Sequence, residues 1–245
     1  MQFNSETVVN GVIERGFTLG EITGALWSPE QGTDGAPLLL SGHSGGMHKH
    51  APGLVANARY LVTECGYTVA AIDAPGHGDR PQDAEDIAAR AAFQRAHQTG
   101  EPMGPLIVEY NTSLAERAVP DWQATIDALQ ELPEIGPDAP IGYGGMTLGV
   151  AIGLMLTAVE PRIAAASFGP VFVYDALIEA ARKTSIPVEF LIAWDDPQIE
   201  PQPTITLFDS CASQDKSMHA YPGDHRGMRG LESSHRARFF ARYLG

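Results

Sequence analysis

Residues 141–149 read IGYGGMTLG, and this stretch decides the fold that we expect for the chain. Gly145 and Gly149 flank Thr147 at the spacing of a sharp strand-to-helix turn, an elbow whose central side chain is presented for reaction. Glycine neighbours are expected there, because the central residue is held at positive φ and adjacent Cβ atoms would collide. An apolar helix is predicted directly afterwards, over residues 149–159. Thr147 is therefore the first candidate for a reactive side chain.

A second stretch, GHSGG at residues 42–46, has the same spacing and contains Ser44. It follows an apolar run that predicts a strand at 37–40, but the residues after it do not form an apolar helix at once. Thr147 alone has the strand, turn and helix in immediate succession. We therefore place the elbow at Thr147 rather than at Ser44.

Short apolar runs alternate with amphipathic segments along the whole chain. The strands that we predict lie at 7–13, 22–27, 37–40, 69–72, 140–142, 163–167, 188–194 and 217–222. Strands that are apolar throughout are typical of a parallel sheet with both faces covered. We predict one α/β domain over residues 1–245, with about eight mostly parallel strands, helices on both faces, and a cap-like helical insertion around 81–111.

Composition excludes several classes of partner. The chain of 245 residues carries a formal net charge of -14, which disfavours binding to nucleic acid or to an anionic membrane. Cys65 and Cys211 are too few for a disulfide framework. No signal segment and no long apolar span are evident, so we expect a cytoplasmic protein.

Polar motifs follow the predicted strands, at the sheet edge where α/β proteins bind ligands. They are SGHSGG, DAPGHGD, GGMTLG, AWDDP and GDHRG. In this order the motifs resemble those of the α/β-hydrolase superfamily, particularly its dienelactone hydrolase and acyl-peptidase-like branch. The resemblance spans nearly the whole chain, and it departs from the family pattern by placing threonine at the nucleophile position.

The resemblance implies a catalytic triad of Thr147, Asp196 and His225. In this family the histidine is the general base and the acid orients it. Asp195 and Asp209 remain alternatives to Asp196, because the first is its neighbour and the second lies shortly downstream.

The resemblance also implies an oxyanion hole, a set of N–H donors for the charge that develops on an attacked carbonyl oxygen. We expect these donors in the loop of Ser44 and Gly45 and in the amide of Leu148. The predicted substrate-binding residues are Tyr110, Phe172 and Trp194, whose aromatic rings suit a small apolar substrate.

No cofactor is expected, because the chain has neither a dinucleotide-binding glycine motif nor a phosphate-binding loop. No metal site is expected at His43, His48 and His50, since no carboxylate or cysteine shares their spacing. A small molecule is the expected partner, and the sequence does not decide whether the chain forms a homodimer.

Three activities remain open, because a β-branched threonine is an unusual residue at an elbow. Thr147 could form an acyl-enzyme in the hydrolysis of a small carboxylic ester, thioester or lactone. Alternatively, the chain is a lyase or a catalytically silent binder in which Thr147 forms no acyl-enzyme.

Overall fold

The computed structural model describes residues 1–32, 35–226 and 231–245. Within these residues nine strands form one sheet, in the spatial order β1-β2-β3-β5-β4-β6-β7-β8-β9. The strands are β1 (Gln2–Val9), β2 (Val12–Leu19), β3 (Ile22–Pro29), β4 (Leu38–Gly42), β5 (Thr68–Ile72), β6 (Ile141–Gly145), β7 (Ile163–Phe168), β8 (Val188–Ala193) and β9 (Lys216–Tyr221). The helices are α1 (Pro52–Cys65), α2 (Ala84–Thr99), α3 (Gly104–Gln130), α4 (Leu148–Thr157), α5 (Asp175–Ala181), α6 (Pro201–Ser210) and α7 (Leu231–Leu244).

The N-terminal end of the sheet is antiparallel and contains one strand more than expected. β1 pairs with β2, β2 with β3, and β3 with β5, all antiparallel. Asn10 and Gly11 join β1 to β2 with φ of 51° and 77°, as a two-residue hairpin turn requires. The single strand predicted over 7–13 is therefore wrong, because this turn divides it.

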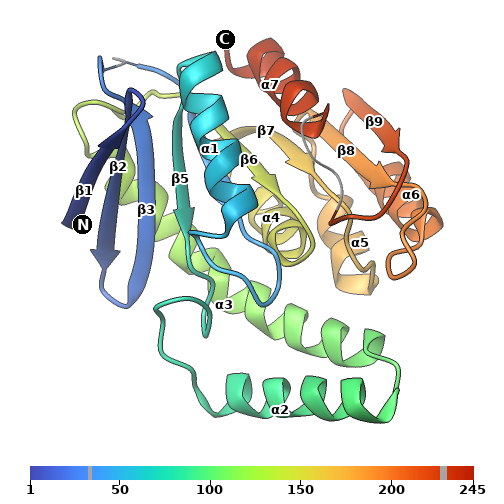
Figure 1. The fold of residues 1–245 in the computed structure, drawn as a ribbon. Helices are drawn as coiled ribbons and strands as arrows, with labels where there is room; N and C mark the ends of the chain where they lie inside the picture. Colours follow the sequence, from blue (N-terminus) through green and yellow to red (C-terminus); the bar gives the residue numbers. More distant parts are fainter. Residues whose placement is uncertain (33–34, 227–230) are drawn as a thin grey trace.

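The remaining strands, from β5 through β4 and β6 to β9, pair in parallel. Helices α1 and α7 cover one face of the sheet, and α3, α4, α5 and α6 lie on the other (Figure 1). The mostly parallel sheet covered on both faces is the predicted α/β architecture. Its central strands β5, β6 and β8 are buried throughout, and in α/β sheets ligands bind beyond the carboxyl ends of such strands.

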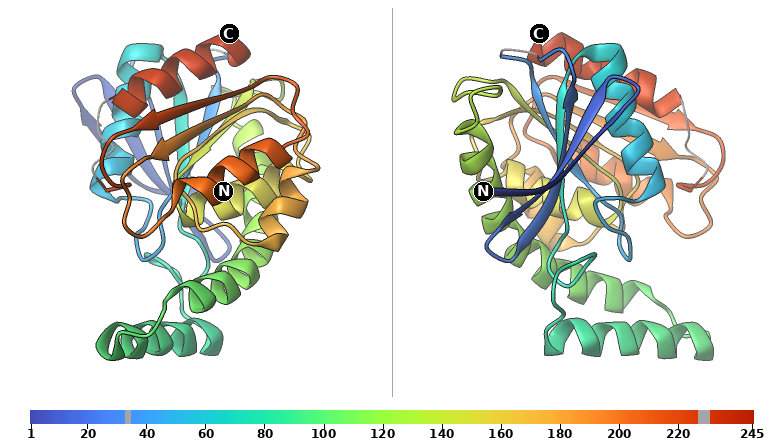
Figure 2. Two further views of the ribbon diagram at one scale, coloured as in Figure 1. Left: turned by 90° about the vertical axis from the view of Figure 1, so that its right-hand side faces the viewer. Right: turned by 60° about the vertical axis from the view of Figure 1, so that its left-hand side comes forward.

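Helices α2 and α3 form a hairpin that projects beyond the rest of the domain, on the side of the strands' carboxyl ends (Figures 1 and 2). Asp83 caps the start of α2, and Pro120 lies inside the 27-residue α3. The hairpin extends further along the chain than the insertion predicted around 81–111, because α3 runs without interruption from the projecting tip into the core. In the described ranges, no helix combines the length and apolar character needed to cross a bilayer.

Candidate active site

Thr147 lies at the turn between β6 and α4 with the strained backbone expected for an elbow. Its φ of 49° and ψ of -108° are rare for a β-branched residue and cost on the order of 1–3 kcal/mol. Two backbone hydrogen bonds hold the turn against the loop after β7. The Thr147 amide donates to the Pro170 carbonyl at 2.9 Å, and the Gly169 amide donates to the Gly145 carbonyl at 2.9 Å.

The two flanking glycines are required by close backbone packing. A Cβ on Gly145 would lie 2.6 Å from the carbonyl carbon of Gly149. A Cβ on Gly149 would lie 2.5 Å from the carbonyl oxygen of Gly42, the last residue of β4. Non-bonded carbon and oxygen atoms do not approach this closely in proteins, so a side chain at either position would force the backbone apart. The glycines therefore allow α4 to pack directly against the end of β4.

The loop that contains Ser44 and Gly45 contacts the elbow. The Gly45 amide donates to Thr147 Oγ1 at 3.3 Å. Leu148 is the first residue of α4, where backbone N–H groups have no partner within the helix. The Gly45 amide thus contacts the threonine hydroxyl, and the Leu148 amide follows Thr147 directly in the chain.

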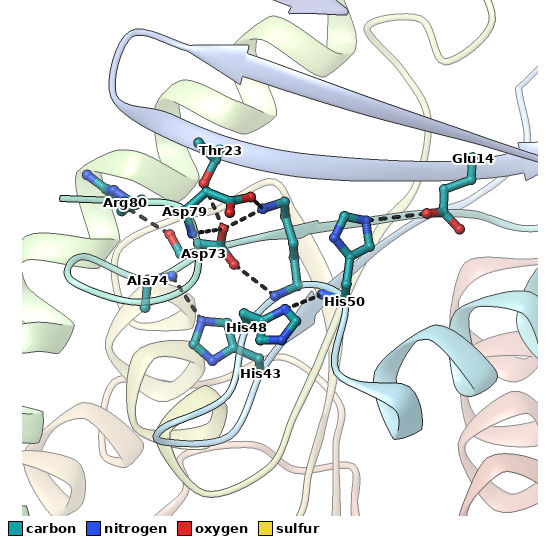
Figure 3. A network of polar contacts seen from close by, with 10 residues as sticks. Glu14, Thr23, His43, His48, His50, Asp73, Ala74, Asp79 and Arg80 are labelled. Atoms are coloured by element: carbon teal, nitrogen blue, oxygen red, sulfur yellow. Dashed lines mark hydrogen bonds and ion pairs between the residues drawn. The ribbon is translucent and has the colours of Figure 1, made fainter. Parts of the chain in front are cut away.

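His43 fixes the conformation of this loop. Its Nε2 accepts a hydrogen bond from the Ala74 amide at 3.0 Å, in the loop after β5 (Figure 3). Its Nδ1 lies 2.9 Å from the Ser44 carbonyl oxygen. The accepting Nε2 leaves Nδ1 as the donor, so the neutral tautomer satisfies both contacts. Burial lowers the pKa of His43 to about 4, which keeps the ring neutral at physiological pH.

A buried ion pair between Lys49 and Asp73 supports the same loop after β4. Asp73 is fully buried, and it accepts hydrogen bonds from the Lys49 ammonium at 2.5 Å, the Lys49 amide at 2.8 Å and Thr23 Oγ1 at 2.7 Å. Lys49 Nζ also pairs with Asp79 at 2.6 Å. Burial alone would raise the pKa of Asp73, but the hydrogen bonds from Lys49 and Thr23 lower it. Asp73 therefore stays ionised and joins the loops after β4 and β5.

His225 and Asp196 form a hydrogen-bonded pair, although they lie 29 residues apart in the chain. His225 Nδ1 lies 2.5 Å from Asp196 Oδ2, and the His225 amide donates to the same oxygen at 2.6 Å. The other oxygen, Oδ1, accepts from the amides of Gln198 and Ile199 at 2.8 and 2.9 Å. The buried carboxylate is thus held by four contacts that fix its plane.

These contacts also control the charge of Asp196. Burial alone would raise its pKa, but the hydrogen bonds from the His225 amide, the Gln198 amide and the His225 ring lower it. An ionised carboxylate beside Nδ1 keeps the proton on that atom and leaves Nε2 as the basic nitrogen. The alternatives to Asp196 lie elsewhere: Asp195 accepts from the Gly223 amide at 3.1 Å, and Asp209 is on α6.

The structure brings the elbow and the histidine pair to the same edge of the sheet, after β6, β8 and β9. In the described part of the chain, no direct hydrogen bond joins the Thr147 hydroxyl to the His225 ring. Such contacts are often long in ligand-free enzymes and shorten when substrate binds.

The three predicted substrate-binding residues have different surroundings. Trp194 follows β8 and is 54% exposed, and Phe172 is half-buried in the loop after β7. Tyr110 is buried on α3, where its hydroxyl donates to Asp86 at 2.8 Å and its ring lies over His77. Tyr110 also lines a cavity of about 300 Å³ between α2 and α3.

A second cavity, of about 360 Å³, lies by the loop after β5 and is lined by charged residues that include Arg80, Asp86 and Arg117. Neither cavity is lined by Thr147 or His225. The candidate active site therefore lies outside both cavities.

Sequence reasoning missed the supporting roles of His43, Lys49 and Asp73. Asp73 was detectable in principle, because it is a carboxylate directly after the fully apolar strand β5. Lys49 gave no such signal, since its buried position depends on how the loop after β4 folds back.

Comparison with known proteins shows that the chain is similar to esterases of known structure. A search of protein-family models and a search of curated proteins each found no match. Among solved structures, the chain is similar to a cold-adapted esterase from an Arctic intertidal metagenomic library, with 27% identity, full coverage of both chains and a TM-score of 0.80.

Two more distant structures share the fold. A dienelactone hydrolase from Anabaena variabilis is 16% identical over the full length of both chains, with a TM-score of 0.67. Acetyl xylan esterase 1 from Thermoanaerobacterium is 16% identical over 99% of this chain and 87% of its own, with a TM-score of 0.70. The chain thus has the fold of the α/β-hydrolase superfamily, as the sequence motifs indicated, and it is similar to an esterase of that fold.

Proposed function

We propose that the chain is a hydrolase of small carboxylic esters, thioesters or lactones in which Thr147 is the nucleophile, His225 the general base and Asp196 the orienting acid. The observation that carries the proposal is the 2.5 Å contact between His225 Nδ1 and Asp196 Oδ2. It supplies an oriented imidazole at the sheet edge where the strained Thr147 elbow and two backbone N–H groups also lie. The similarity to a cold-adapted esterase at 27% identity supports the same class of reaction.

The reaction would proceed in two halves. In the first, Thr147 Oγ1 attacks the carbonyl carbon while His225 Nε2 removes the hydroxyl proton. The carbonyl oxygen becomes an oxyanion and accepts hydrogen bonds from the amides of Gly45 and Leu148. The bond to the leaving oxygen or sulfur breaks, and His225 returns the proton to that atom.

In the second half, water replaces the leaving group. His225 removes a proton from the water as it attacks the acyl carbon, and the bond to Thr147 Oγ1 breaks. The acid product leaves, and Thr147 regains its proton from His225. The Gly45 amide, which donates to the Thr147 hydroxyl at 3.3 Å in the free protein, would exchange that partner for the oxyanion.

A second candidate rests on the missing direct hydrogen bond between Thr147 and His225 in the described residues. In this version His225 activates water directly, and Thr147 only positions the substrate. The lyase and silent-binder alternatives likewise need no acyl-enzyme.

Covalent labelling distinguishes these candidates. The protein is incubated with a fluorophosphonate, and the modified residue is located by mass spectrometry, alongside turnover of p-nitrophenyl esters, thioesters and lactones. The proposal expects a label on Thr147 that is lost in Thr147→Ala and His225→Ala, with turnover lost in both variants. Ser44→Ala tests the rival serine and is expected to keep the label.

Each of three other outcomes would contradict the proposed covalent mechanism. Retained ester turnover in Thr147→Ala, with turnover abolished in His225→Ala, would exclude the acyl-enzyme and support direct attack by water. A label on Ser44 would show that the nucleophile lies in the loop after β4 and that Thr147 is not the nucleophile. Saturable ligand binding without turnover of any acyl substrate would support the silent binder.

A further inference from the structure

Glu189 is a buried carboxylate that the proposed hydrolysis does not use. It lies in β8, a strand whose six residues are all buried, and its side chain is 2% exposed. Ionised side chains are rarely buried so completely unless a partner or a metal ion compensates the charge. Glu189 is near the amino end of β8, whereas Asp196 follows the carboxyl end, so the two carboxylates serve different sites.

The two oxygens of Glu189 have separate surroundings. Oε2 accepts a hydrogen bond from Ser167 Oγ at 2.9 Å, and Ser167 Oγ in turn lies 3.2 Å from the donating Nε of Arg236. Burial raises the pKa of Glu189, and the Ser167 hydrogen bond and the charge of Arg236 oppose that rise. Oε1 lies 3.5 Å from Nε2 of His219. Ser167 thus fixes one oxygen while the other faces an imidazole.

A second imidazole lies beside the first. The rings of His219, on β9, and His235, on α7, have centroids 4.4 Å apart. Two protonated rings at this separation would repel each other. A neutral imidazole presents a nitrogen lone pair, which is the form that binds a metal ion.

One nitrogen of each histidine and one oxygen of Glu189 lie within 4.8 Å of one another. Among the described residues, these three form the one group of at least three ligand residues brought this close together. Around a tetrahedral zinc ion, with bonds of about 2.0–2.2 Å, donor atoms are roughly 3.4 Å apart. The pair of Glu189 and His219, at 3.5 Å, already has this separation. The His235 donor atom lies within 4.8 Å of both, so it needs to approach by at most about 1.4 Å.

We propose that Glu189, His219 and His235 form a site for Zn²⁺ or a similar divalent transition metal. Two imidazoles and one carboxylate are a donor set that suits zinc, with water as the fourth ligand. The hard cations Mg²⁺ and Ca²⁺ prefer oxygen donors and are not expected to bind. Ser167 supplies the supporting hydrogen bond that metal-bound carboxylates commonly accept.

The metal would join three elements, β8, β9 and α7, at one end of the sheet. His219 precedes His225 in the chain and His235 follows it, so the ion would connect the two segments that flank the candidate base. We assign the site a structural role, in which binding stabilises the folded chain by mass action. The proposal does not depend on the proposed hydrolysis.

The test is a zinc titration of the whole chain after treatment with a chelator. Calorimetry is expected to give one Zn²⁺ per chain and the melting temperature to rise with zinc, while Mg²⁺ gives neither effect. His219→Gln and His235→Gln are each expected to weaken binding about tenfold or more. Substituting Co²⁺ is expected to give the strong visible absorption of a tetrahedral site, which both variants reduce.

His48→Ala/His50→Ala is the matched control, because it removes two neighbouring exposed imidazoles from another surface. It is expected to bind zinc as the unmodified chain does. The proposal is overturned if no stoichiometric binding occurs, if His219→Gln and His235→Gln bind as tightly as the original chain, or if only the control loses binding. Glu189→Gln adds a third test, and the partly exposed His219 keeps the result interpretable if that buried variant does not fold.

Discussion

His225 binds Asp196 Oδ2 twice, through its backbone amide at 2.6 Å and its ring at 2.5 Å. The first contact fixes the position of the residue, and the second fixes the orientation of its ring. Because Oδ1 of Asp196 is held by the amides of Gln198 and Ile199, the carboxylate cannot rotate to follow a displaced histidine. The pair is therefore a rigid unit built from two loops.

Asp196→Asn should remove most of the activity without unfolding the chain. The amide cannot hold His225 in the tautomer with Nδ1 protonated, and loss of that tautomer costs about 10⁴-fold in kcat in a comparable triad. Steady-state kinetics on a p-nitrophenyl ester measure the change. Asp195→Asn is the control and is expected to retain near-normal kcat. An Asp196→Asn enzyme with more than about a tenth of the original kcat would contradict the assignment.

Thr147→Ser should raise the rate of ester hydrolysis. The variant keeps the hydroxyl and removes the methyl group that crowds its attack, and a tenfold gain corresponds to about 1.4 kcal/mol of barrier. We expect kcat to rise by about that factor and fluorophosphonate labelling to accelerate. A lower kcat in the serine variant would show that the methyl group assists the reaction.

His43→Ala should lower kcat while leaving KM nearly unchanged. The substitution frees the Ser44 carbonyl and the Ala74 amide, so the Gly45 amide is no longer held toward Thr147. Loss of a whole oxyanion donor costs about 10²–10³-fold, and we expect a smaller decrease, of about 10–100-fold. His48→Ala, in the same loop but exposed, serves as the control. Equal effects of the two variants would rule out this positioning role.

Asp86→Asn should destabilise the chain in a pH-dependent manner. The buried Asp86 binds Arg117 at 2.9 Å and Tyr110 at 2.8 Å. Because Arg117 is 28% exposed and also pairs with Asp83, losing these charged hydrogen bonds costs on the order of 1–3 kcal/mol. Burial raises the pKa of Asp86, but the hydrogen bonds from Arg117, Asp83 and Tyr110 lower it below the ordinary 3.8.

A depressed pKa in the folded state contributes stability above the ordinary value, and this contribution is lost as pH falls through the folded value. The difference in unfolding free energy between the original chain and Asp86→Asn should therefore be largest above pH 3.8 and shrink below it. Urea titrations between neutral pH and about pH 3 measure it. A difference in unfolding free energy that increases as the pH falls would contradict the assignment of an ionised Asp86.

Gly149→Ala should destabilise the chain by several kcal/mol, because its Cβ would meet the Gly42 carbonyl oxygen at 2.5 Å. Gly53→Ala is the matched control, since a Cβ there meets no atom within 4 Å and the residue lies in α1. That variant is expected to stabilise the helix by up to about 1 kcal/mol. Thermal unfolding of both variants tests the claim, and equal melting temperatures would refute it.

The parallel part of the fold could be predicted because each of its strands and helices is marked by residues within or next to its own segment. Buried strands are short apolar runs, and Gly66 ends α1 with a φ of 72°, as a glycine after an apolar helix predicts. The β1–β2 hairpin was also predictable, since Asn10 followed by Gly11 is a strong signal for a two-residue turn. It was missed because the apolar residues on both sides of the turn resemble one continuous strand.

The candidate site was harder to predict where it depends on distant contacts. Thr147, Asp196 and His225 each follow a strand, so their positions could be inferred from chain order. Nothing local indicates that Lys49 is buried against Asp73, or that Glu189 lies beside two histidines. Such contacts depend on the pairing of strands and the return of loops, which sequence periodicity does not specify.

The strained turn at Thr147 is held from outside by the loop after β7, through the carbonyl of Pro170 and the amide of Gly169. The hydroxyl is consequently aligned only while that neighbouring segment stays closed. If this loop opens locally, the backbone at Thr147 can leave its strained conformation while the sheet and its helices remain intact. Mild heat or denaturant should therefore inactivate the enzyme before circular dichroism detects any loss of secondary structure.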